Sequence, residues 1–143
     1  MSVHQISIFL ENRAGQLAEI TRLLADKGVN LRALNIAETK DYGVLRLIVD
    51  DTDKAVEALL AQGNILSKTP VTVVCVPDEA GGLATVLAVL AEGQLDVEYM
   101  YSLFTHKAGK AYMVFRISDE EKFLALLAKC GIHAADKAEL GLK

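Results

Sequence analysis

Two short segments of the chain share a polar residue, an Ala-Gly step and a leucine. Asn12–Leu17 reads Asn-Arg-Ala-Gly-Gln-Leu, and Asp78–Leu83, shifted by 66 positions, reads Asp-Glu-Ala-Gly-Gly-Leu. Glycine allows unusual dihedral angles and close approach of the backbone to a ligand. The N–H groups that open a following helix are free to hold a carboxylate. The chemistry that this pattern favours is anion binding.

Side chains of the first segment could add to such a site. Asn12 offers both a donor and an acceptor, and Arg13 could clamp a carboxylate. The alternative is that Asn12 or Asp78 only tightens the turn into its helix and that Arg13 points into solvent. Both interpretations stay open on the sequence alone.

The second segment offers one acidic and two small side chains where the first offers donors. The replacements are Glu79 for Arg13, Ala80 for Ala14 and Gly82 for Gln16. We therefore expect a carboxylate to prefer the first loop. A side chain at Gly15 would intrude where the ligand touches backbone, so Gly15→Val is expected to abolish binding, whereas Gly81→Val should leave the first site at least partly active.

Other chemistries are not indicated. The three histidines (His4, His106 and His133) are far apart and show no metal-ligand spacing with cysteine or acidic residues. No nucleophile elbow, P-loop or dinucleotide fingerprint occurs. Cys75 lies in an apolar strand-like run and Cys130 near the end of a helix-like run, and both are expected to be buried free thiols. We expect no catalytic residue, metal or cofactor.

Each loop follows a strand-like pattern and opens a helix-like one. In the first half we predict a strand at 3–10, a helix ended by Gly28, an extended stretch at 29–39, a hairpin turn at 40–43, a strand at 45–49, a helix at 52–62 and a strand at 64–69. In the second half we predict a strand at 71–76, a helix at 82–92, a strand at 95–105, a turn at 106–110, a strand at 112–117, a helix opened by a capping box at Ser118 and ended by Gly131, and a short strand at 132–135.

Each half thus has the β-α-β-β-α-β order of a ferredoxin-like unit. The predicted fold class is α+β, with two such units, each a four-stranded antiparallel sheet that carries its helices on one face. The predicted domains are 1–69 and 70–143, with Pro70 at the joint. Thr72, Val74 and Val76 should face the helices, yet Val71, Val73 and Cys75 are apolar too, so this strand should be covered on both faces. The first repeat or a second copy of the chain could cover it.

Composition narrows the classes of protein. The chain has 143 residues, 52% hydrophobic and 24% charged, with a net charge of −4, which is typical of a folded globular protein. No apolar run is long enough to span a membrane, and we expect a cytoplasmic location. The negative charge and the absence of a basic block argue against broad capture of nucleic acid or acidic membrane.

The residues resemble the ACT domain family. The resemblance rests on the run Ile6–Leu17 with Gly28-Val29-Asn30-Leu31, and on Pro77–Leu83 with Gln94-Leu95-Asp96-Val97. It implies a ligand-sensing module that binds an amino acid or a similar carboxylate at an interface between units and regulates an enzyme. Together with the loop chemistry, it gives the candidate ligand-binding residues Asn12, Arg13, Ala14, Gly15, Gln16, Leu17, Asn30, Leu31, Asp78, Ala80, Gly81, Gly82, Leu83 and Asp96.

The resemblance further implies a stand-alone tandem ACT protein, more distantly like the small regulatory subunit of acetolactate synthase. We expect a homodimer and a metabolic enzyme as partner. Two alternatives stay open: a regulatory subunit that has no ligand of its own, and an RNA-binding module. An RNA-recognition motif shares the element order, and Lys110–Phe115 faintly resembles its third strand. The net charge and the aromatic-free strand at 71–76 count against it.

Overall fold

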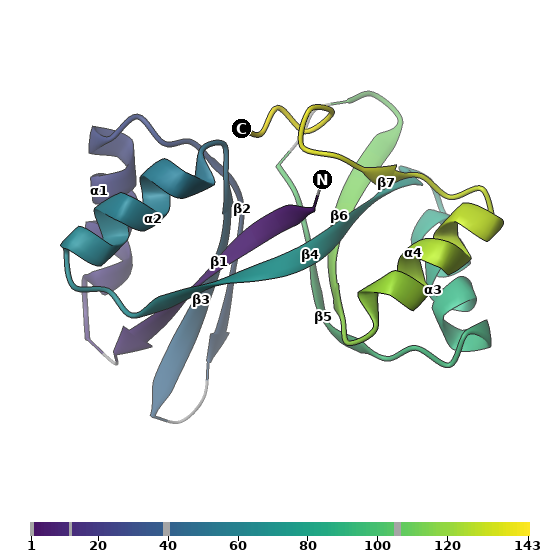
Figure 1. Ribbon diagram of the computed structural model, residues 1–143, viewed down its shortest axis with the longest axis horizontal. Coiled ribbons are helices and arrows are strands. Elements are labelled where there is room, and N and C mark those ends of the chain that lie inside the picture. Colours follow the sequence, from purple (N-terminus) through teal and green to yellow (C-terminus); the bar gives the residue numbers. More distant parts are fainter. Residues whose placement is uncertain (1, 12, 39–40, 105–106) are drawn as a thin grey trace. The chain divides into compact units, whose positions relative to one another are not determined.

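The computed structural model describes residues 2–11, 13–38, 41–104 and 107–143. Figure 1 shows the described elements in chain order, which are β1 (Val3–Glu11), α1 (Gln16–Asp26), β2 (Leu31–Glu38), β3 (Tyr42–Val49), α2 (Thr52–Ala61), β4 (Leu66–Pro77), α3 (Gly82–Glu92), β5 (Val97–Ser102), β6 (Lys110–Ile117), α4 (Glu120–Lys129) and β7 (Ala134–Ala135).

These elements form two compact units. One comprises His4–Thr69 with Gly141–Lys143, and the other comprises Pro70–Leu140 with the start of the chain. The strand order is β2-β3-β1-β4 in the first unit and β7-β4-β6-β5 in the second. The β1–β3, β2–β3, β4–β6, β4–β7 and β5–β6 pairs are antiparallel. The predicted α+β, ferredoxin-like class is confirmed.

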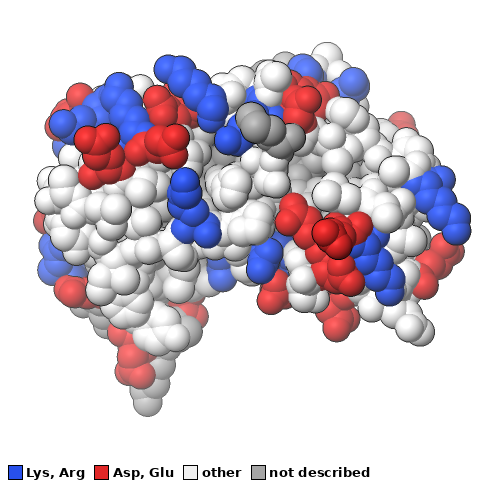
Figure 2. Space-filling model, in the orientation of Figure 1, with Lys and Arg blue, Asp and Glu red and all other residues white. Residues whose placement is uncertain are grey.

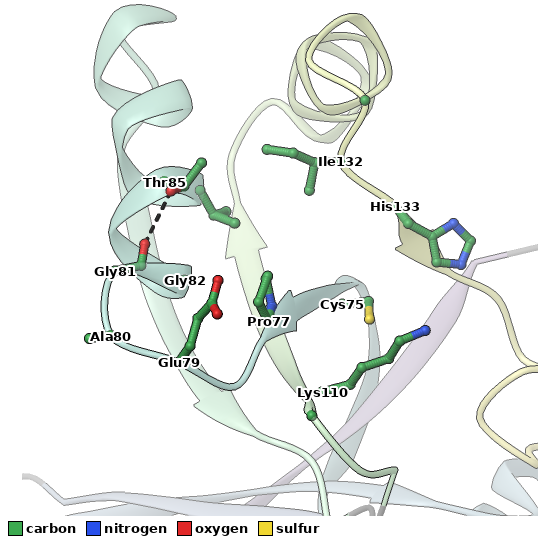
Figure 3. A pocket seen from close by; sticks show the side chains of 13 residues that line it. Cys75, Pro77, Glu79, Ala80, Gly81, Gly82, Thr85, Lys110, Ile132 and His133 are labelled. Carbon is green, nitrogen blue, oxygen red and sulfur yellow. Dashed lines mark hydrogen bonds between the residues drawn. The ribbon is translucent and has the colours of Figure 1, made fainter.

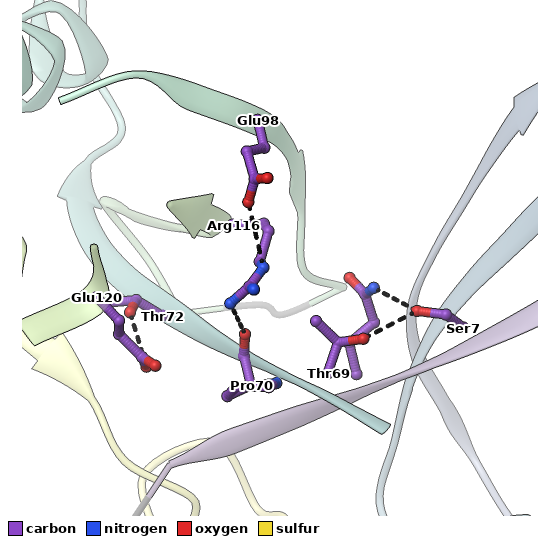
Figure 4. Close-up of polar contacts among 8 residues, drawn as sticks. Ser7, Thr69, Pro70, Thr72, Glu98, Arg116 and Glu120 are labelled. Carbon is purple, nitrogen blue, oxygen red and sulfur yellow. Dashed lines mark hydrogen bonds and ion pairs between the residues drawn. The ribbon is translucent and has the colours of Figure 1, made fainter. Parts of the chain in front are cut away.

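Strand β4 contributes to both units. The prediction of separate strands at 64–69 and 71–76 was wrong, because β4 runs from Leu66 to Pro77 and Pro70 lies inside it. Proline can occupy a strand position where its missing N–H is not required. The carbonyl oxygen of Pro70 accepts a hydrogen bond from Arg116 Nη1 at 3.2 Å, and Arg116 Nε is 3.3 Å from Glu98 Oε2 (Figure 4).

The core of the first unit lies between its sheet and its two helices. Alternate strand residues face the helices, as the period of two predicted. The fully or nearly fully buried members are Ile6, Ile8, Ile20, Leu24, Val29, Leu45, Leu47, Val49, Ala55 and Leu59. Leu17 and Leu31 pack at the edge of this core. The first loop is thereby fixed at both ends, by β1 and by α1.

The second unit repeats this arrangement with different residues. Its core contains Val74, Val76, Val86, Leu90, Phe115, Ile117, Phe123 and Leu127. The Phe115 and Phe123 rings meet edge to face, with centroids 5.6 Å apart. Thr72, on the same face as Val74 and Val76, donates to Glu120 Oε1 (Figure 4). The predicted two-sided character of this strand is also observed, because Val71 and Val73 on the opposite face are buried.

The two repeats differ in the position of the glycine that follows their first helix. After α1, Gly28 adopts φ 72°, as expected for a glycine that ends a helix. After α3, the corresponding left-handed residue is Gln94, with φ 55°. The glycine of that turn is Gly93 instead, where an added Cβ would overlap Leu126 Cδ1. A side chain at position 93 would make Leu126 of α4 shift, and Gln94 adopts the less favourable left-handed conformation.

Several predicted boundaries need correction. Asp119, not Ser118, caps α4 by accepting from Lys122 N. The turns predicted at 40–43 and 106–110 fall partly outside the described residues, but Tyr42 and Gly43 already belong to β3 and Lys110 to β6. Strand pairing explains this difference, because Gly43 pairs with Glu38 of β2 and Lys110 pairs with Pro77 of β4. The strands predicted at 95–105 and 132–135 are shorter than expected, at Val97–Ser102 and Ala134–Ala135. The expectation of a buried thiol was wrong for Cys130, which is exposed, and Cys75 is only partly buried.

Candidate ligand-binding site

Both predicted loops end in a glycine with the same backbone conformation. Gly15 has φ 86° and ψ −7°, and Gly81 has φ 90° and ψ −8°. Each glycine is the N-cap of its helix and neither helix start has a side-chain cap. Helices α2 and α4, by contrast, are capped by aspartate side chains. Of the four described helices, only α1 and α3 therefore begin with first-turn N–H groups that have no described capping side chain.

The second loop brings the end of β4 close to the start of α3. Gly82 donates its N–H to Glu79 O at 3.1 Å, and a Cβ at Gly82 would overlap the carbonyl oxygen of Pro77. The hairpin turn between β5 and β6 is joined to the loop as well, because Asp78 N donates to Gly109 O at 2.9 Å. A side chain larger than hydrogen at position 82 would force these segments apart.

A pocket of about 630 Å³ opens at this second loop (Figure 3). Its walls come from the end of β4, the loop itself, the start of α3, the start of β6 and the segment that follows α4. The lining residues are Cys75, Pro77, Glu79, Ala80, Gly81, Gly82, Thr85, Val86, Gly109, Lys110, Gly131, Ile132 and His133. The uncapped start of α3 thus faces a cavity that is large enough for a small metabolite.

The pocket carries charges of both signs. Glu79 lies at the start of α3, and Lys110 lies on the other side of Pro77, near Cys75 and His133 (Figure 3). His133 Nε2 is 2.8 Å from Glu139 Oε2, so this imidazole already has an acidic partner. Among the residues that the structure describes, neither Lys110 nor Glu79 has a side-chain ion pair.

The first loop borders a smaller pocket of about 210 Å³. It is lined by Leu10, Glu11, Arg13, Ile36, Glu38, Tyr42 and Gly43. The guanidinium of Arg13 makes two hydrogen bonds of 3.0 Å to the carboxylate of Glu19. These hydrogen bonds, and then the positive charge of Arg13, lower the pKa of Glu19. A ligand carboxylate would have to compete with Glu19 for this cation.

The two loops also differ at the first residue of the helix that each one opens. Gln16 takes the place of Gly82, and its side chain is buried with 9% of its surface exposed. Its Oε1 atom has no hydrogen-bond partner within the described part of the chain. A glutamine side chain therefore occupies the space in the first loop where the second loop has only the backbone of a glycine.

The predicted binding residues fall into three groups. Ala80, Gly81 and Gly82 line the 630 Å³ pocket, and Arg13 lines the smaller one. The others that are described line neither of these two pockets; they are Ala14, Gly15, Gln16, Leu17, Asn30, Leu31, Asp78, Leu83 and Asp96. Asn12 lies outside the described residues.

Two of these residues have structural contacts of their own. The backbone N–H of Asn30 donates to Asp50 Oδ1 at 2.9 Å, and the carbonyl of Asn30 accepts from Asp50 N at 3.0 Å. Leu83 packs against the core of the second unit. Asn30 thus joins the start of β2 to the end of β3, and Leu83 anchors the first turn of α3.

Sequence reasoning missed the far side of the larger pocket. Thr85 lies in α3, Lys110 in β6 and His133 between α4 and β7, and none of them was predicted as a site residue. The sequence contains only a partial signal for Lys110, because it follows Gly109, the counterpart of Gly43 in the repeat. Its position opposite Pro77 is seen only in the structure. No comparable pattern marked His133, which reaches the pocket only because β7 pairs with β4.

Two further observations bear on function. Within the described residues, no group of three or more His, Cys, Asp or Glu side chains could hold a metal ion. None of the described helices combines the length and the apolar character needed to cross a membrane.

Comparisons with known proteins identify the family and the fold. The family model described as "ACT domain pair" matches residues 1–138. The chain is 32% identical over 68 residues to the probable acetolactate synthase small subunit of Archaeoglobus fulgidus, a match that covers 46% of this chain and 43% of that protein. The matched region is thus less than half the length of this curated relative.

Two solved structures resemble the whole chain. Protein BT0572 from Bacteroides thetaiotaomicron is 38% identical, with a TM-score of 0.91, over 99% of this chain and 96% of that one. The ligand-free regulatory subunit of aspartate kinase from Thermus thermophilus has a TM-score of 0.65 at 16% identity, over 90% of this chain and 93% of that one. The second likeness is one of fold alone.

Proposed function

The chain belongs to the ACT domain pair family, and from this premise we propose that it is a non-catalytic regulatory protein that binds an amino acid or a similar carboxylate. The proposed domains are residues 1–69 and 70–143, one ACT domain each. The proposed site residues are those of the two loops, with Asn30, Leu31 and Asp96 at the adjoining strand starts.

One observation carries this proposal. The helix start at Gly81 has no side-chain cap and opens into a pocket of about 630 Å³. A helix N-terminus favours an anion, because its N–H groups lack intrahelical acceptors and the helix dipole is positive there. A carboxylate at this position would accept the kind of hydrogen bond that backbone N–H groups of α2 and α4 donate to their aspartate caps.

The cavities favour the second loop as the main site, the reverse of the order predicted from the sequence. The first loop has the smaller pocket, and its Arg13 is paired with Glu19. The second loop has the larger pocket, and its Lys110 has no ion pair among the described residues. We therefore propose that the second loop binds first and that the first loop is the weaker site.

A thermal-shift screen of the full chain against the common amino acids tests this proposal. A ligand that binds only the folded state stabilises it by about 2.7 kcal/mol at one hundred times its dissociation constant. At least one amino acid should raise the melting temperature, and Gly81→Val should remove that rise. If no amino acid or related carboxylate shifts the melting temperature at millimolar concentration, the proposal is wrong.

A second candidate function is that of a regulatory subunit of an amino-acid biosynthetic enzyme such as acetolactate synthase. The observation in its favour is the identity with the Archaeoglobus fulgidus protein that bears this name. Copurification of a catalytic subunit with the tagged chain would support it, and a partner enzyme that bound without any ligand response would favour a subunit that has no ligand of its own.

We also propose that the protein is a homodimer, as the family resemblance implies. The apolar residues Val71 and Val73, which first suggested a second copy, are already buried in the single chain. They no longer support the dimer, so the family resemblance alone motivates it. Light scattering that gave only monomer at micromolar concentration would exclude it.

The RNA-binding alternative loses support. RNA-recognition motifs stack bases on exposed aromatic rings of the sheet, but Tyr112 and Phe115 are buried here, with 1% and 0% of their surfaces exposed. On the face shown in Figure 2, basic and acidic side chains are mixed and form no continuous basic patch. A filter-binding assay with single-stranded RNA is expected to give no retention at physiological salt.

A further inference from the structure

Three charged features of the 630 Å³ pocket differ in sign and in position. The start of α3 is the positive end of a helix that has no side-chain cap. Glu79 adds a carboxylate beside it, and Lys110 adds an ammonium group beyond Pro77 (Figure 3). The His133 imidazole already has an acidic partner, because its Nε2 lies 2.8 Å from Glu139 Oε2. The pocket therefore offers two cationic centres and one anionic centre.

An ordinary zwitterionic amino acid matches only two of these centres. Its carboxylate can lie on the helix start and its ammonium group beside Glu79, which leaves Lys110 without a partner. A ligand with a second carboxylate has one oppositely charged group for each of the three centres. We propose that the second loop selects an acidic amino acid, whose side-chain carboxylate pairs with Lys110. This inference rests on the proposed function and names the class of ligand for the same site.

Contacts around Lys110 support its availability. Lys110 begins β6, opposite Pro77, and lies on the same face of the sheet as Tyr112, which is opposite Cys75. Its neighbour in the turn, Lys107, has its ammonium nitrogen 5.8 Å from the centroid of the Tyr112 ring. Among the described residues, Lys110 has no ion pair. An acidic side chain that entered the pocket would not have to displace a protein carboxylate from it.

The first half of the chain provides an internal comparison. Under the shift of 66 positions, Val44 corresponds to Lys110 and Arg13 corresponds to Glu79. The first loop thus has no cation at the matching place in its hairpin, and a cation where the second loop has its acid. The charge pattern that we assign to an acidic amino acid is confined to the second loop.

Titration calorimetry on the full chain at low ionic strength tests the inference. The probes are L-glutamate and L-aspartate, each compared with its neutral isostere, L-glutamine or L-asparagine, and with L-leucine. A partly exposed ion pair contributes little, so we expect the better acid to bind about threefold to fivefold more tightly than its amide. The preference should fall as salt is added.

Two variants test which group of the ligand pairs with Lys110 and which pairs with Glu79. Lys110→Met should remove the preference by weakening the acid and leaving the amide unchanged, because only the acid has a second carboxylate. Glu79→Gln should weaken acid and amide alike, because both ligands carry the ammonium group. Lys129→Met, which removes an exposed lysine at the end of α4, is the matched control and should change nothing.

The outcomes separate this inference from the proposed function. If glutamine or leucine binds at least as tightly as the acids, the acidic class is wrong, although the regulatory function stands. If Lys110→Met weakens glutamate and glutamine equally, Lys110 holds the carboxylate that both share, and the inference fails in the same way. If none of these five amino acids binds, the inference is overturned, and the thermal-shift screen against the other amino acids and related carboxylates decides whether the proposed function stands.

Discussion

Replacing Gly15 and Gly81 by valine, one at a time, tests which loop holds the ligand. The two glycines are a closely matched pair, because their φ values are 86° and 90° and an added Cβ would meet nothing within 4 Å at either position. The cost to stability is therefore backbone strain alone, about 1 to 2 kcal/mol in each variant. Each kcal/mol should lower the melting temperature by about 4–8 °C in a domain of 60–100 residues.

The effect on binding should differ although the effect on stability does not. At Gly81 the valine side chain would stand at the uncapped helix start, inside the wall of the 630 Å³ pocket. Losing one hydrogen bond to a charged group costs about 1.5–3 kcal/mol, which weakens binding about tenfold to a hundredfold. At Gly15, which lines neither the larger nor the smaller pocket, the same change should leave the main site active.

The assay is calorimetry with the tightest-binding amino acid, on variants that circular dichroism shows to be folded. It decides which of the two loops holds the ligand. Unchanged binding by a folded Gly81→Val variant would refute the assignment to the second loop. Loss of binding from Gly15→Val alone would support the order that the sequence suggested. Equal losses from both variants would show that the two loops act on one ligand.

Three further predictions concern single side chains. Gln94→Gly should stabilise the protein by about 0.5–1 kcal/mol in urea unfolding, because it relieves a left-handed conformation at φ 55°; a destabilised variant would contradict this. Asp119→Ala should cost about 1 kcal/mol through the lost helix cap, whereas Ser118→Ala should cost much less; equal effects would mean that the cap is assigned wrongly. Arg13→Gln should raise the pKa of the Glu19 carboxyl, followed by NMR, towards its ordinary value. Because that pKa is lowered in the folded state, the stabilisation by this pair is present above the unfolded pKa and is lost as pH falls through the folded one; a pKa that does not move would exclude the pair in solution.

The repeat could be predicted from the sequence because local patterns determine it. Alternating residues such as Ile6 and Ile8 reach the core whatever their neighbours are, and the Ala-Gly step marks the left-handed residue in both halves. Pro70 misled the prediction, because a proline was taken as a break between strands. Inside β4 its carbonyl still accepts a hydrogen bond, and the strand continues.

The pocket could not be predicted in full, because it depends on residues that only the fold brings together. Lys110 and His133 reach the second loop from opposite sides of β4, through strand pairings that single-sequence patterns do not specify. Gln94 shows a similar limit. The glycine of this turn is the adjacent Gly93, and the contact of that position with Leu126 of α4 can be seen only in the fold.

Each end of the chain groups with the repeat that lies farther from it in the sequence, and this has a consequence for any attempt to separate the two repeats. The last three residues of the chain group with the first unit, where Lys143 N donates to Asp50 O at 2.8 Å, and the start of the chain groups with the second. A gene fragment that encodes only one repeat would therefore lack a peptide that its own unit uses. If the chain arose by duplication of a single ancestral domain, simple deletion of one copy would no longer restore that ancestor.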